Sequence, residues 1–233
     1  MRIVAIVSPK GGTGKSSVAT ALAVEAAGRG ATLLYDLDPQ ETAARWHGIH
    51  RRQAAEEGRL SLGMAMRRVA RPERAAAEML RDAESSSYEW AICDTAGGAY
   101  RALGEVAALA DLLIAPVQPW APDLAAAPRL AAFVAGLPSP PPLVALLSRV
   151  PARAGARADF ARAALSDAGI SCFTASIRQS VVWPDAYEQG RAPQEMPVWR
   201  SHRAAREVKA LFGEVADMID SIERKERING ATG

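Results

Sequence analysis

The chain has 233 residues, of which 49% are hydrophobic, and this is enough to bury the core of one α/β domain. Its formal net charge is only +2, so any binding of nucleic acid must depend on a local cluster of cations and not on an overall basic field. The two cysteines, Cys93 and Cys172, form no C-x-x-C pair, which argues against an iron–sulfur or zinc site. No signal peptide and no apolar run of roughly 18 residues is visible, so we expect a cytoplasmic protein.

A glycine-rich loop separates the first predicted strand, at 3–7, from a helix predicted between Ser17 and about Gly28. In such a loop the glycines let backbone N–H groups turn toward phosphate oxygens, and the helix adds the positive end of its dipole. Lys15 is placed to contact the β- and γ-phosphates of a nucleotide, and Ser16 to bind Mg²⁺. The predicted nucleotide-binding residues of the loop are Lys10, Gly11, Gly12, Thr13, Gly14, Lys15, Ser16 and Ser17.

A second lysine, Lys10, stands at the mouth of this loop. The chain has only four lysines among its 28 Lys and Arg residues, and two of the four are Lys10 and Lys15, where a compact charge suits phosphate. The stretch KGGTGKS resembles the deviant Walker A motif KGGxGK[ST] of the ParA/MinD family of P-loop ATPases. The resemblance implies one domain with a mostly parallel twisted sheet and helices on both faces, ATP and Mg²⁺ as cofactors, and catalytic roles for Lys10 and Lys15.

The second predicted strand, at 32–35, runs into Asp36-Leu37-Asp38-Pro39-Gln40. Two carboxylates at i and i+2 on a strand point the same way, and Pro39 stops the strand. Taken alone, this stretch could equally be a solvated acidic turn. DxDPQ resembles a ParA-type motif, which implies that Asp38 orients the attacking water and that Asp36 supports the Mg²⁺ site.

A third acidic residue follows the apolar run from Trp90 to Cys93. An apolar strand that ends in a carboxylate, Asp94, and continues into small residues and Gly97-Gly98 is the Walker B arrangement. We therefore expect Asp94 to hold the water shell of Mg²⁺.

Between the two acidic motifs the pattern predicts a helix from Glu41 to about Ala55, a short strand within 60–69, and a helix with Pro72 at its first position that continues from Ala75 to Leu80.

The remaining elements alternate as in an α/β domain. They are strands at 111–117, 143–147 and 170–173, and helices from Asp123, as the cap, to about Ala135, from Ala156 to Ala168, and from Trp199 to about Arg224. Residues 120–124 resemble the family's P-x-x-P-x-D-L segment. Arg178-Gln179 and residues 183–190 loosely resemble the loop and helix that follow a strand in the partition proteins. Ser148 stands where related proteins often carry an Asn that reads adenine, so Ser148 is a predicted nucleotide contact.

Four cations lie at steps of three along the last predicted helix: Arg200, Arg203, Arg206 and Lys209. A solvated surface and a phosphate-contacting patch are both open readings, and the four are candidate DNA-binding residues. Residues 1–222 are expected to form the ATPase domain and residues 223–233 a flexible charged tail. This tail is too charged and too poor in large apolar residues to be a MinD-like membrane anchor.

The resemblance implies a function as well as a fold. We expect an ATPase that dimerises with ATP sandwiched between subunits, binds DNA nonspecifically on the nucleoid, and segregates DNA or positions a cargo when a ParB-like protein or cargo adaptor stimulates hydrolysis. We expect no extra DNA-binding domain before Arg2. The alternatives are a VirC1-like helper of DNA transfer and a positioner of a protein cargo, such as a chemoreceptor cluster or carboxysome. A metal-carrier or biosynthetic P-loop enzyme would need a C-x-x-C or a second substrate pocket.

Overall fold

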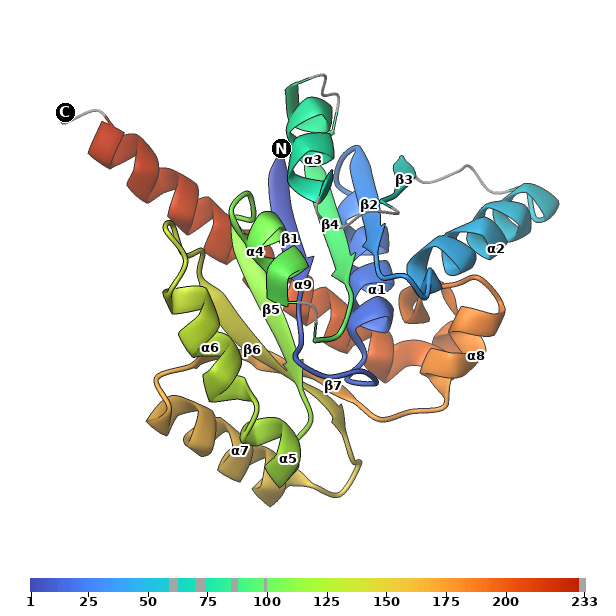
Figure 1. Ribbon diagram of the computed structural model, residues 1–233. Helices are drawn as coiled ribbons and strands as arrows, with labels where there is room; N and C mark the ends of the chain where they lie inside the picture. The colour runs from blue at the N-terminus through green and yellow to red at the C-terminus, as the bar shows by residue number, and fades with distance from the viewer. Residues whose placement is uncertain (59–62, 70–73, 85–87, 99, 231–233) are drawn as a thin grey trace.

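The computed structural model describes residues 1–58, 63–69, 74–84, 88–98 and 100–230 (Figure 1). Within them, one parallel sheet has the strand order β3-β2-β4-β1-β5-β6-β7. The strands are β1 (Arg2–Ile6), β2 (Thr32–Leu37), β3 (Met64–Arg68), β4 (Trp90–Thr95), β5 (Leu112–Val117), β6 (Leu143–Val150) and β7 (Ser171–Arg178). The helices are α1 (Lys15–Ala27), α2 (Thr42–Glu56), α3 (Ala75–Glu84), α4 (Tyr100–Ala107), α5 (Ala121–Leu124), α6 (Ala127–Ala135), α7 (Gly155–Asp167), α8 (Val182–Glu188), the 3₁₀ helix η2 (Pro193–Glu195) and α9 (Val198–Gly230).

Helices cover both faces of the sheet. Alternate residues of a strand point to opposite faces, so Val4 and Ile6 of β1 pack in one hydrophobic core and Ile3 and Ala5 in the other. Figure 1 shows α4 and α6 on one side of the sheet and α1 and α9 on the other. Because both faces are buried, the central strands β1, β2, β4 and β5 are nearly continuous apolar runs instead of alternating ones. The predicted fold class is confirmed.

The order of the strands places the glycine-rich loop at the centre of one sheet edge. β1 lies between β4 and β5, and the chain leaves its carboxyl end to form α1 and then β2, on the far side of β4. Ligands of open parallel sheets bind where the strand order reverses in this way. The loop after β1 therefore lies next to the carboxyl ends of β4 and β5.

Three predicted elements differ most from the observed ones. The helix expected from Asp123 to Ala135 is two helices, α5 and α6. The N-cap residue of α5 is Trp120, and no side chain of the described residues caps this helix, so Asp123 lies inside it. The last strand continues to Arg178, five residues beyond Phe173. The C-terminal helix α9 extends to Gly230, through most of the segment assigned to a flexible tail, and Glu223 accepts from Arg2 Nε at 2.9 Å. The predicted helix start at Pro72 lies outside the described residues.

Candidate functional site

The glycine-rich loop needs its glycines for backbone conformation. Gly12 has φ 75° and Gly14 has φ 95°, both in the left-handed region that other residues rarely adopt. Gly14 is the N-cap of α1, and no side chain caps this helix. The N–H groups at the start of α1 are therefore left for another acceptor, which makes this helix end suited to an anion.

Gly97 meets the same loop from β4. A methyl group added at Gly97 would lie 3.0 Å from the backbone nitrogen of Gly11 and 3.0 Å from the carbonyl carbon of Lys10. Only glycine allows so close an approach without displacement of the loop. The small residues after Asp94 thus bring the Walker B strand and the phosphate loop into backbone contact.

The two lysines of the loop point to different places. Lys15 is buried, and its Nζ donates to the carbonyl of Lys10 at 3.1 Å. Burial lowers the pKa of Lys15, while the carboxylates of Asp94 and Asp38 act to raise it. Lys10 is more exposed, and its Nζ lies 3.4 Å from the carboxylate of Asp123 on α5. Lys15 is thus the inner cation of the loop and Lys10 the outer one.

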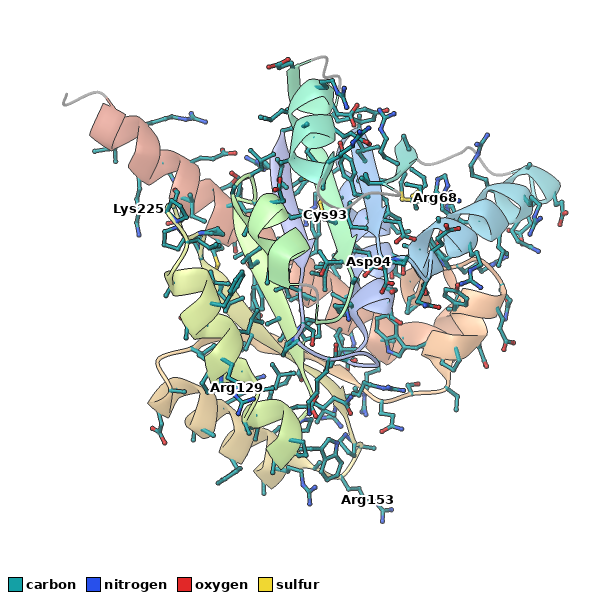
Figure 2. The ribbon with its side chains drawn as sticks, in the orientation of Figure 1. Arg68, Cys93, Asp94, Arg129, Arg153 and Lys225 are labelled. Atoms are coloured by element: carbon teal, nitrogen blue, oxygen red, sulfur yellow. The ribbon has the colours of Figure 1, made fainter. Side chains whose placement is uncertain are left out.

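Asp94 is fully buried at the end of β4, in the interior of the molecule (Figure 2). Neither carboxylate oxygen of Asp94 has a hydrogen-bond partner within the described residues. The Ser16 hydroxyl is nevertheless near enough to lower the pKa of Asp94. Burial raises the pKa of Asp94 to about 7, with a further rise from Asp36 and an opposing effect of Ser16 and Lys15. A buried carboxylate without partners is costly, so such a group fits a site completed by a cation.

Asp36 and Asp38 differ in environment although they point to the same edge of the sheet. Asp36 is buried, and its two oxygens accept from the backbone nitrogens of Asp38, at 3.0 Å, and Ala44, at 2.8 Å. Burial raises the pKa of Asp36. Asp38 is half-buried and accepts from the backbone nitrogen of Gln40 at 2.9 Å. Asp36 therefore holds the Asp38 loop and the start of α2, and direct binding of Mg²⁺ by Asp36 stays a prediction.

A cavity of about 870 Å³ opens over the loop. Gly12, Lys15, Ser16 and Asp38 line one side of it, and residues 177–188, which end β7 and form α8, line the other. Its size is within the range of small-molecule and cofactor sites, about 300–1,000 Å³. Asp38 and six of the predicted loop residues thus line one cavity: Gly11, Gly12, Gly14, Lys15, Ser16 and Ser17. Lys10 and Thr13 do not line it, and Asp94 is buried next to Ser16.

Ser148 has a contact that the sequence did not predict. Its side chain is 1% exposed, and its hydroxyl donates to the carbonyl of Thr13 at 2.8 Å. The residue thus supports the loop from β6, while its contact with adenine stays a prediction. Two other side chains, missed entirely, donate to the carbonyl of Gly12: Arg149 Nη1 at 2.7 Å and Gln118 Nε2 at 3.3 Å.

The candidate DNA-binding cations do not form one row. Arg203 and Arg206 line a surface hollow of about 350 Å³ together with Arg178 from the end of β7. Glu207 lies in this hollow and accepts from the backbone nitrogen of Arg178 at 3.1 Å. Lys209 instead lies close enough to Glu25 of α1 for its charge to oppose the rise in the pKa of Glu25 that burial causes. Arg178 was predicted to lie in a loop after the last strand and was not a candidate DNA-binding residue, because its strand was predicted to end earlier. The side chain of Arg200 lies outside the described residues.

Comparison with known proteins agrees with this geometry. Residues 4–228 match the profile of the CobQ/CobB/MinD/ParA nucleotide-binding domain. The chain belongs to this family. It is 33% identical over 225 residues, 96% of each chain, to "Maintenance of carboxysome distribution protein A" of Gloeobacter kilaueensis.

Solved structures of MinD share the fold. MinD in the MinC:MinD complex of Aquifex aeolicus superposes with a TM-score of 0.75 at 15% identity, over 93% of this chain and 96% of that one. MinD of Pyrococcus horikoshii, solved with Mg-ADP, superposes with a TM-score of 0.66 at 18% identity, over 92% of this chain and 95% of that one. At these identities the likeness concerns the fold.

The residues present fit the ligands of the CobQ/CobB/MinD/ParA family. Lys15 and the start of α1 offer positive groups to phosphates, and the unpartnered oxygens of Asp94 beside Ser16 are the ligand type that Mg²⁺ prefers. Members of the ParA/MinD branch are ATPases, and bound Mg²⁺ neutralises charge on the transferred phosphate. None of the helices in the described part of the chain is long and apolar enough to cross a membrane.

Proposed function

We propose that the chain is a Mg²⁺-dependent ATPase that forms an ATP-sandwiched homodimer and positions a cargo. The observation that carries this proposal is that a buried lysine, Lys15, and a solvent-accessible carboxylate, Asp38, line one cavity. A buried carboxylate without a hydrogen-bond partner among the described residues, Asp94, lies next to Ser16 of the same lining. In this assignment Lys15 binds the phosphates, Asp94 and Ser16 hold Mg²⁺, and Asp38 orients the attacking water.

Lys10 supports the dimer part of the proposal. Its Nζ is held at the rim by Asp123, and its side chain is 38% exposed, whereas Lys15 lies beneath. An exposed cation beside a phosphate site is available to the nucleotide of a second subunit. We assign Lys10 this contact across the dimer.

Nonspecific binding of DNA is proposed for the hollow of Arg178, Arg203 and Arg206. Three guanidinium groups in one concave surface match phosphate oxygens. Their charges act on a common point, since burial raises the pKa of Glu207 in this hollow and all three arginines oppose that rise. With a formal net charge of +2 the chain lacks a general basic field. One such patch gives weak binding, and an ATP-locked dimer gains by placing two patches on the same polymer.

Two kinds of cargo are compatible with this machinery. A DNA cargo would involve a ParB-like partner that stimulates hydrolysis. A protein cargo, linked by an adaptor, is favoured by the 33% identity to a protein named for carboxysome distribution. In either case the nucleoid would serve as the surface on which the dimer is held.

Retention on random-sequence duplex DNA tests the proposal. Binding should require ATP, be absent with ADP or without nucleotide, and weaken steeply with salt, with a log–log slope of about −0.9 per phosphate neutralised. Arg203→Ala with Arg206→Ala should weaken binding to all sequences and flatten the slope without loss of ATP-dependent dimerisation. Lys209→Ala, which removes a charge outside the hollow, is the matched control. Absence of ATP-dependent retention even at low salt would contradict the DNA-binding function.

A further inference from the structure

Arg149 has an unusual backbone for its residue type. It has φ 51°, in the left-handed region, and lies where the pairing of β6 with β7 shifts register between Leu147 and Val150. Glycine is the residue that adopts this conformation without strain at such a bulge. An arginine in this conformation costs conformational free energy. A β-bulge can redirect the side chain of its residue.

The redirected side chain reaches the phosphate loop. Arg149 lines the nucleotide cavity, and its Nη1 donates to the carbonyl of Gly12 at 2.7 Å. The next carbonyl of the loop, that of Thr13, accepts from the hydroxyl of Ser148 at 2.8 Å. Two consecutive residues of β6 thus hold two consecutive carbonyls of the loop.

The consequence for phosphate binding follows from peptide geometry. In a planar trans peptide the C=O of one residue and the N–H of the next point in opposite directions. When the carbonyls of Gly12 and Thr13 are fixed, the N–H groups of Thr13 and Gly14 are also fixed. Neither of these N–H groups donates to an acceptor within the described parts of the chain. They are thus oriented donors in a loop whose function is to present N–H groups to phosphate.

We propose that Arg149 is a positioning residue for nucleotide binding, which holds the Gly12 carbonyl so that the Thr13 N–H keeps its direction. This assignment rests on the proposed function of the cavity as the ATP site. Ser148 does the same for the next peptide unit from beneath the loop. Gln118 Nε2, at 3.3 Å from the Gly12 carbonyl, is a weaker second donor to it.

Arg149→Gly separates this role from a merely structural one. Glycine relieves the left-handed strain, so the free energy of unfolding of the nucleotide-free protein should stay unchanged or rise. The affinity for Mg·ATP should nevertheless fall about tenfold, the order expected on loss of a hydrogen bond to a charged group. Urea unfolding and titration calorimetry measure the two quantities. A residue important only for stability would change both in the same direction.

Two further variants define what Arg149 supplies. Arg149→Gln keeps a neutral donor within reach of the loop, and its ATP affinity should lie between those of the wild type and Arg149→Gly. Arg153→Ala is the matched control, because Arg153 is an exposed arginine that projects from the edge of the molecule (Figure 2) and carries the same charge four residues on. Its ATP affinity should equal that of the wild type.

The results that overturn the assignment are distinct. Wild-type ATP affinity in Arg149→Gly would show that the loop does not need the guanidinium. An equal loss in Arg153→Ala would attribute the effect to general charge and not to the Gly12 contact. Failure of the wild type itself to bind ATP would refute the proposed function, and this assignment with it.

Discussion

The least solvated charged group of the site is Asp94, and its environment costs stability. Both oxygens are buried without a hydrogen-bond partner among the described residues, and its pKa is raised to about 7 from an ordinary value of 3.8. The folded state therefore binds a proton more tightly than the unfolded state. The Asp94 contribution makes folding less favourable as pH rises from about 4 to above 7. Functional sites often carry such a cost because a ligand later removes it.

Asp94→Asn should therefore stabilise the protein without Mg²⁺ or nucleotide. A neutral amide of the same shape is less costly to bury than a carboxylate, and we expect a gain of about 3–4 kcal/mol at pH 8. The gain should fall to about 1–2 kcal/mol at pH 5, because Asp94 is then protonated in the folded state but already largely ionised in the unfolded state. Urea unfolding of the wild type and the variant at the two pH values measures this. The same variant should bind Mg·ATP much more weakly. A gain that does not depend on pH would mean that the Asp94 carboxylate is not the source.

Asp38 should act on the nucleophile, because it is half-buried and lines the cavity, while Lys15 and Asp94 lie beneath. Asp38→Ala should bind Mg·ATP with nearly wild-type affinity and hydrolyse it at least about 100-fold more slowly, since only the positioned base is lost. Calorimetry and a phosphate-release assay give the two numbers. Wild-type turnover in this variant would assign the water to another residue.

The site residues that could be predicted from the sequence are those that belong to a short local motif. Spacing and the apolar strands that precede them predict the loop from Lys10 to Ser17 and the carboxylates Asp38 and Asp94. The contact of Asp123 with Lys10 and that of Ser148 with Thr13 join residues more than 100 positions apart. No local pattern encodes such pairs, so Asp123 was wrongly predicted to be a helix cap.

At the scale of elements, the wall of the cavity opposite the loop depends on the junction between α2 and the segment after α8. The indole of Trp46 donates to the carbonyl of Arg191 at 3.1 Å, and His50 Nδ1 hydrogen-bonds to the carbonyl of Gly190 at 2.9 Å. Gly190 has φ 57°, and a methyl group there would lie 2.5 Å from the backbone nitrogen of His50. This junction thus has no room for a side chain.

Gly190→Ala should destabilise the protein more than backbone strain alone explains. Gly58 has a similar φ of 62°, and an added methyl group there would have no atom of the described residues within 4 Å. Gly58→Ala therefore measures the strain, about 1–2 kcal/mol. The clash should add about 1–3 kcal/mol in Gly190→Ala. It should also weaken ATP binding, because α8 lines the cavity. Equal unfolding free energies for the two variants would mean that the junction adjusts freely.

The elements themselves were predictable where burial and periodicity agree. The strands β1, β2, β4 and β5 are apolar runs ending at a charge, a glycine or a proline, and their predicted positions are close to the observed ones. β7 is different: its burial alternates, and its pairing with β6 is irregular. Its sequence therefore lacks a continuous apolar run, and the strand was predicted too short, so Arg178 was expected in a loop and not at the strand's end.

At the scale of the whole molecule, one edge of the sheet carries all the charged groups assigned to nucleotide. Lys10 is at its rim, fixed by Asp123 from α5, and the hollow of Arg178, Arg203 and Arg206 lies beside the cavity, because Arg178 lines both. A second subunit placed against this edge would meet Lys10 before Lys15. A DNA cargo and a protein cargo were both predicted, because every motif identified in the sequence serves the nucleotide.

Lys10→Ala tests whether this edge is the dimer interface. Because Lys15 remains in place, the variant should bind Mg·ATP with an affinity within about threefold of wild type. It should, however, stay monomeric with ATP at concentrations where the wild type dimerises, since the proposed contact with the partner's nucleotide is lost. Light scattering with ATP, with ADP and without nucleotide measures this. Asp123→Asn removes the holder of Lys10 but keeps the cation, so it should still dimerise. Normal ATP-dependent dimerisation of Lys10→Ala would argue against a sandwiched nucleotide, whereas loss of dimerisation in both variants would show that Lys10 acts through its pairing with Asp123 on α5.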